Sequence, residues 1–136
     1  MSETRDITLH LAELITGENR ASAGEIYDAL IEVNFQIWKD DAAHGFQIGG
    51  PEAISYAAVV ISFFGSILVQ ATKDAAAKFL ADRLKAFVEQ NIALSRADLE
   101  TIHKRIEKAV ASGKLTKEKG DRLWKDIQVT LDKGPV

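Results

Sequence analysis

The sequence contains no cysteine and only two prolines, Pro51 and Pro135. The absence of cysteine excludes disulfides, thiolate nucleophiles and cysteine-based zinc or iron–sulfur sites. Because proline removes a backbone N–H and clashes inside a helix, the long proline-free stretch between the two favours long helices. The first residues, MSETRDITLHLAEL, include early acids and lack the apolar core of a secretory signal, so we expect a cytoplasmic protein.

Motifs for catalysis are also missing from the sequence. No serine stands in a G-x-S-x-G sequence, and the stretch GFQIGG lacks the Lys-Ser/Thr pair of a phosphate-binding loop. His10 has no partner residue at catalytic spacing. The sequence therefore predicts a protein that is not an enzyme and that needs no cofactor.

Two acid-x-x-His pairs, Asp41 with His44 and Glu100 with His103, have the spacing that helical bundles use for paired iron or manganese ions. Glu100 falls on the flank of its predicted helix rather than on the face toward the core. Asp41 and His44 lie beside Gly45, where a helix is expected to end. Such positions are typical of solvated or capping side chains, so we predict no metal site.

The chain has 136 residues, of which 46% are apolar and 27% charged, as in an ordinary single globular domain. Its net charge of −3 is unevenly distributed. Residues 1–52 hold three basic and ten acidic residues, whereas residues 72–136 hold fourteen basic and ten acidic ones. Such halves attract each other, within one chain or head-to-tail between two chains. Two solvated surfaces that merely differ in charge explain the pattern equally well.

The spacing of apolar residues predicts five helices and no strand. Two acidic N-terminal helices are expected within residues 6–43, with a break after residue 16. No breaker interrupts residues 51–91, so one long, largely apolar central helix is expected there. A basic helical hairpin over residues 95–132 completes the chain. The expected fold is an all-α bundle of about five helices around this central helix, with residues 1–136 as a single domain.

Local signals support several of these helix boundaries. Ser22 followed by Glu25, and Ser95 followed by Asp98, match the pattern in which a hydroxyl and an acid cap a helix start. The first helix places four apolar residues on one side: Ile7, Leu11, Leu14 and Ile15. The second is expected to extend from residue 22 to about residue 43.

Residues 53–72 form an uncharged run of twenty residues, which as a helix rises about 30 Å, the thickness of the hydrocarbon layer of a bilayer. By length this run is a candidate membrane span. Its serines, glycine and glutamine weaken that interpretation, and the other amphipathic helices can wrap it as a core. A soluble bundle is therefore our first interpretation. A membrane-inserted or pore-forming protein, with the lysine-rich C-terminal side in the cytoplasm, is the alternative.

One face of the central run carries the residues that we nominate for an interaction. Ala58, Ser62 and Ser66 are small residues four apart, and Gln70 continues the same line. Small residues at this spacing allow a second helix to approach closely, or they line a pore. Trp124, in the basic closing hairpin, is the remaining interaction candidate.

Six basic residues cluster in the closing hairpin: Lys104, Arg105, Lys108, Lys114, Lys117 and Lys119. Acidic residues interleave with them and no aromatic platform is evident, which argues against nucleic acid as the partner. The sequence predicts a non-enzymatic helical protein that binds a protein partner or forms homo-oligomers, with membrane insertion of residues 53–72 as the alternative.

Overall fold

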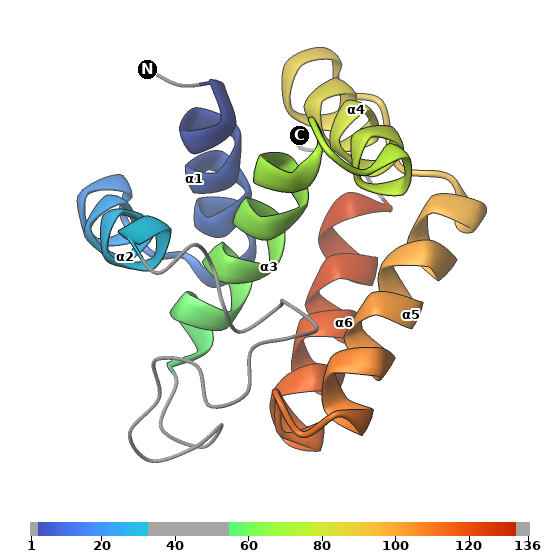
Figure 1. Ribbon diagram of the computed structural model, residues 1–136. Coiled ribbons are helices and arrows are strands. Elements are labelled where there is room, and N and C mark those ends of the chain that lie inside the picture. The colour runs from blue at the N-terminus through green and yellow to red at the C-terminus, as the bar shows by residue number, and fades with distance from the viewer. Residues whose placement is uncertain (1–2, 33–54, 133–136) are drawn as a thin grey trace.

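The computed structural model describes residues 3–32 and 55–132, and within these ranges the protein is all-α, as predicted (Figure 1). The described part contains six helices: α1 (Glu3–Thr16), α2 (Arg20–Glu32), α3 (Tyr56–Gln70), α4 (Ala75–Gln90), α5 (Arg96–Ala111) and α6 (Lys117–Leu131). They form a bundle in which α3 contacts α1, α2, α4 and α6, while α5 packs against α6.

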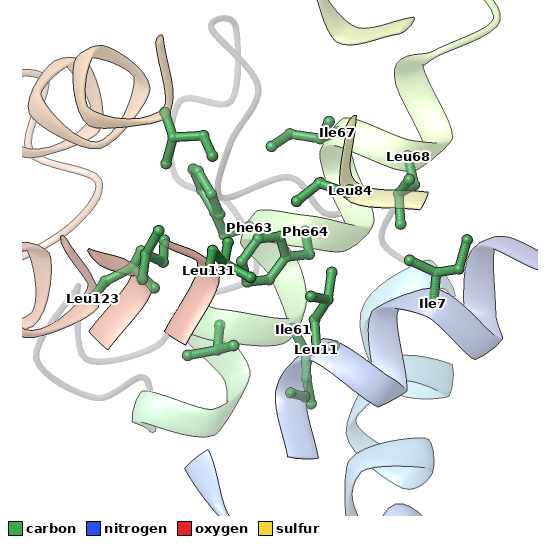
Figure 2. Close-up of a cluster of buried hydrophobic side chains, with 14 of the residues drawn as sticks. Ile7, Leu11, Ile61, Phe63, Phe64, Ile67, Leu68, Leu84, Leu123 and Leu131 are labelled. Atoms are coloured by element: carbon green, nitrogen blue, oxygen red, sulfur yellow. The ribbon is translucent and has the colours of Figure 1, made fainter. Parts of the chain in front are cut away.

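The core of the bundle is built around α3. Every residue of this helix from Val59 to Leu68 is buried. Phe63 and Phe64 are fully buried with their rings edge to face, 5.2 Å apart between centroids. Figure 2 shows them among apolar side chains from α1, α4 and α6, including Leu84. Full burial of a side chain of this size is worth about 1.5–3 kcal/mol, so α3 contributes a large share of the core stability.

The long central helix predicted for residues 51–91 is instead two helices. The axes of α3 and α4 are bent by 117° at the break that follows Gln70. Asp74 has extended backbone there, and its carboxylate accepts a hydrogen bond from the backbone N–H of Ala76 at 3.0 Å. This cap starts a new helix because it replaces the intrahelical partner that the N–H lacks. The bend returns Leu80 and Leu84 of α4 to the core around α3.

The start of the central helix also differs from the prediction. Ser55 has φ −67° and ψ 155°, and its hydroxyl oxygen accepts a hydrogen bond from the N–H of Ala58 at 3.2 Å. Ser55 is therefore a helix cap, and α3 begins at Tyr56 rather than at Pro51. Residues 33–54 lie outside the described residues, as does the predicted continuation of the second helix to residue 43.

The predicted cap at Ser22 is wrong, because α2 begins two residues earlier, at Arg20. The side chain of Asn19 accepts a hydrogen bond from the N–H of Ser22 at 2.8 Å, so Asn19 is the residue that caps α2. The predicted apolar face of α1 is nearly correct. Ile7 is buried, but Leu14 is 39% exposed at its edge, and Leu9 is fully buried instead.

The closing hairpin follows the prediction closely. Ser95 and Asp98 form a complete capping box: each side chain accepts a hydrogen bond from the backbone N–H of the other. Gly113 has φ +80°, a conformation that favours glycine, and makes the turn after α5. Thr116 caps α6.

Within residues 3–32 and 55–132, no single helix is long and apolar enough to cross a bilayer, although α3 and α4 meet the length and composition criteria jointly as a bent pair.

Candidate functional site

The two serines nominated on α3 lie inside the core. Ser62 is 1% exposed and Ser66 is 2% exposed. Their hydroxyls donate hydrogen bonds to backbone carbonyl oxygens of the same helix, those of Val59 at 3.1 Å and Phe63 at 2.9 Å. A helical serine satisfied in this way presents mainly its small size to the neighbouring helices. A partner protein reaches these residues only if the helices around α3 move apart.

The other nominated interaction residues are partly accessible. Ala58 packs against the core from the first turn of α3, and Gln70, half-buried, is the last residue of that helix. The half-buried Trp124 on α6 stacks on His103 of α5, with the ring centroids 4.2 Å apart and the planes 3° apart. This contact joins the two helices of the closing hairpin.

The weak metal candidates are not assembled into a ligand set. His103 stacks on the indole of Trp124, and its Nε2 lies 3.6 Å from an oxygen of Glu107, whereas Glu100 is exposed. No group of three metal-ligating side chains suited to an ion occurs in the described part of the chain. Asp41 and His44 lie outside the described residues.

A polar contact joins the start of α3 to α6. The hydroxyl of Tyr56 donates a 2.7 Å hydrogen bond to a carboxylate oxygen of Asp126, and the guanidinium of Arg122 lies 3.8 Å from the centroid of the tyrosine ring. Burial, reinforced by the hydrogen bond to Asp126, raises the pKa of Tyr56 well above its usual value. The Arg122–Asp126 spacing is visible in the sequence, but Tyr56 is distant from it, and sequence reasoning missed the contact.

A cleft of about 540 Å³ opens between α1 and the end of α4. Its lining combines apolar and charged side chains: Asp6, Ile7, His10, Arg20, Val88 and Glu89. The charge of Arg20 is matched by an ion pair with Glu13, at 3.3 Å. Asp6 and Glu89 are exposed, and neither makes an ion pair within the described residues. The cleft therefore presents two carboxylates, which form no ion pair within the described ranges, beside the apolar side chains of Ile7 and Val88.

Large apolar side chains are also exposed around the molecule. Those in the described ranges with the most exposure are Leu14, Ile31, Phe79, Ile92 and Val129, which are between 39% and 54% exposed. Phe79 lies on α4 with the guanidinium of Arg83 at 4.6 Å from its ring centroid. Aromatic and arginine side chains are enriched in protein interfaces, but single exposed residues are common on monomers.

Each charged hairpin contains an ion pair of its own, and Asp98 of α5 also lies 3.6 Å from the guanidinium of Arg83 on α4. In the acidic hairpin, Arg5 of α1 pairs with Asp28 of α2 at 3.1 Å. In the basic hairpin, Lys117 pairs with Asp121 at 3.1 Å within α6. Figure 1 shows α2 and α5 on opposite sides of α3. The acidic excess of residues 3–32 and the basic excess of residues 96–131 therefore lie on different sides of α3.

Comparison with protein-family models, with curated proteins and with solved structures found no match to this chain.

Proposed function

We propose that this chain is a non-enzymatic cytoplasmic protein that acts by protein–protein association, and that its preferred partner is a second copy of itself. The observation that carries the proposal is the separation of charge across the bundle. Residues 3–32, which form α1 and α2, hold seven acidic and two basic residues. Residues 96–131, which form α5 and α6, hold nine basic and six acidic residues.

Opposite charges on two sides of one molecule favour association between copies. The acidic side of one copy attracts the basic side of the next, and complementary potentials of this kind also raise the rate of encounter. Exposed apolar side chains occur on both sides, with Ile31 on α2 and Val129 on α6. Such side chains add apolar burial to an interface that charge alone holds weakly.

Sedimentation velocity over a range of protein concentrations tests this proposal. In about 0.05 M salt we expect the weight-average mass to rise with concentration. In about 0.5 M salt the Debye length falls to about 4 Å, so the same samples should be largely monomeric. A single monomeric species at every concentration in both buffers contradicts self-association. A rise in mass that is insensitive to salt contradicts the role of charge.

Membrane insertion of the central run is a second candidate, and the internal hydrogen bonds of α3 favour it. Because the hydroxyls of Ser62 and Ser66 donate to carbonyl oxygens of their own helix, α3 keeps these bonds when it leaves the protein core. The bent α3–α4 pair also has the length and composition of a broken span. Against this candidate, insertion requires breaking the hydrogen bond between Tyr56 and Asp126.

Dye release from phosphatidylcholine–phosphatidylglycerol vesicles separates the two candidates. Membrane insertion predicts release by the wild-type protein, and faster release by Tyr56→Phe, which lacks the hydroxyl that holds α3 to α6. Self-association without insertion predicts no release by either protein. If both proteins release dye at the same rate, insertion is supported, but the hydrogen bond between Tyr56 and Asp126 does not control it.

A further inference from the structure

The end of the closing hairpin is the most strongly basic part of the molecule. It comprises residues 104–119, namely the end of α5, the turn at Gly113 and the start of α6, and we call it the basic tip. It holds six basic and two acidic residues. Lys104 and Lys108 are exposed on α5, and Lys117, which pairs with Asp121, is exposed on α6. Several long cationic side chains therefore project from one compact turn.

The cleft between α1 and α4 has the complementary properties. Asp6 and Glu89 supply carboxylates without ion-pair partners in the described residues, and Ile7 and Val88 supply apolar surface beside them. A lysine side chain suits such a site because its methylene stem packs on apolar groups while its ammonium reaches a carboxylate.

The basic tip and the cleft of one copy cannot meet each other. The cleft includes the end of α4, which a short linker joins to the start of α5, and the tip lies at the other end of α5. A helix of 16 residues is about 24 Å long. In Figure 1 the turn between α5 and α6 lies at the bottom of the view, whereas α4 lies at the top. A contact between the two surfaces therefore requires two molecules.

We infer that the basic tip of one copy binds in the cleft between α1 and α4 of a second copy, so that copies associate head-to-tail. The inference rests on the proposed function, because it names the surfaces through which copies associate. A head-to-tail contact is heterologous: each copy contributes a different surface and leaves one of each kind free. Wild-type protein should therefore form species larger than dimers as its concentration rises.

Two charge-reversal variants test this pairing. The tip variant combines Lys104→Glu with Lys114→Glu, and the cleft variant combines Asp6→Lys with Glu89→Lys. Each variant retains one intact surface and loses the other. We expect each to be monomeric alone, with a dissociation constant raised at least about tenfold. Mixed in equal amounts, they should associate again, because the intact tip of the cleft variant meets the intact cleft of the tip variant and the two reversed surfaces are again opposite in charge.

A matched control reverses two exposed lysines outside the tip, Lys73→Glu and Lys125→Glu. It changes the net charge as much as the tip variant does, so it should associate like the wild type if the position of the charge matters. Far-UV circular dichroism and thermal unfolding should show all three variants to be folded, because every substituted residue lies on the exposed or half-exposed surface.

The outcomes separate this inference from the proposed function. Recovery of association in the mixture supports the pairing of tip and cleft. Wild-type association that survives both reversals overturns the pairing but leaves self-association standing. If both variants are monomeric alone and do not associate when mixed, the pairing is also overturned. That result is expected if a change in net charge, or disruption of a two-fold symmetric contact, abolished association. A wild type that is monomeric and binds phosphatidylglycerol vesicles through the tip overturns both proposals.

Discussion

Gly120 allows a close contact between α5 and α6, and replacing it with alanine tests the packing of the closing hairpin. A Cβ atom at this buried position would lie 2.6 Å from Cγ2 of Val110 and 3.5 Å from Cγ2 of Ile106. Valine in a helix is restricted to essentially one χ1 rotamer, so its methyl group cannot simply rotate away. Either the two helices separate slightly or the side chains leave their preferred positions.

The expected size of the effect comes from two opposing contributions. In the interior of a helix, alanine is more favourable than glycine by about 1 kcal/mol. Overpacking a well-filled core costs about 1–3 kcal/mol, and the stiff valine methyl places this contact toward the upper end. We therefore expect Gly120→Ala to lower the free energy of unfolding by about 1–2 kcal/mol, measured by urea unfolding followed by circular dichroism.

Gly24 provides a matched control within α2. Its added Cβ would lie 2.8 Å from Nη2 of Arg5, the end of a long flexible side chain that can move into solvent. Gly24→Ala should therefore be neutral or stabilise the protein by up to about 1 kcal/mol. In a Val110→Ala background, Gly120→Ala should likewise stop being destabilising. A gain in stability for Gly120→Ala in the wild-type background would refute the tight α5–α6 contact.

Three further predictions concern α3 and its contacts. Ser66→Ala should change the free energy of unfolding by no more than about 1 kcal/mol, because one internal hydrogen bond is lost and helix propensity is gained. Ser66→Leu should cost about 1–3 kcal/mol by overpacking. Equal urea midpoints for the two variants would show that the site is not tightly enclosed. Phe64→Ala should lower the free energy of unfolding by about 3–5 kcal/mol. Phe79→Ala, on the exposed face of α4, should lower it by no more than about 1 kcal/mol. Similar losses for the two variants in the same assay would contradict the assignment of Phe64 to the core. Folding raises the pKa of Tyr56, so the native state favours the neutral phenol. The stabilisation that results is complete below about pH 10, where the tyrosine of the unfolded chain starts to ionise. It is lost as the pH rises further. Tyr56→Phe should therefore flatten the fall in unfolding free energy above about pH 10, and an unchanged slope would exclude Tyr56 as a contributor.

The sequence predicted the features of the fold that depend on residues close together in the chain. The capping box of Ser95 and Asp98 needs only its own two residues, and it is present as expected. The break before Asp74 was missed because no glycine or proline marks it. Its one signal was the change from an uncharged run to charged residues at Lys73. At the start of α2, Asn19 and Ser22 are both competent caps, and local pattern alone does not decide between them.

The candidate site was less predictable because it depends on how the helices pack. The spacing of Ser62 and Ser66 predicts only that they share one face of a helix. The packed structure is needed to show that Ser62 is enclosed and hydrogen-bonded within its own helix. The cleft requires Asp6 and Glu89, from helices far apart in the sequence, to meet across a gap. The contact between Tyr56 and Asp126 spans 70 residues. No periodic pattern within one helix encodes such pairings.

The position of α3 in the chain has a consequence for synthesis. Its buried stretch ends at Leu68, but α6, which helps to cover it, ends only at Leu131. At about 5–20 residues per second, a ribosome needs roughly 3–13 s to make the intervening chain. During that interval α3, the most apolar of the described helices, has been made without its final cover. The nascent chain is therefore a natural client for chaperones that bind exposed apolar segments.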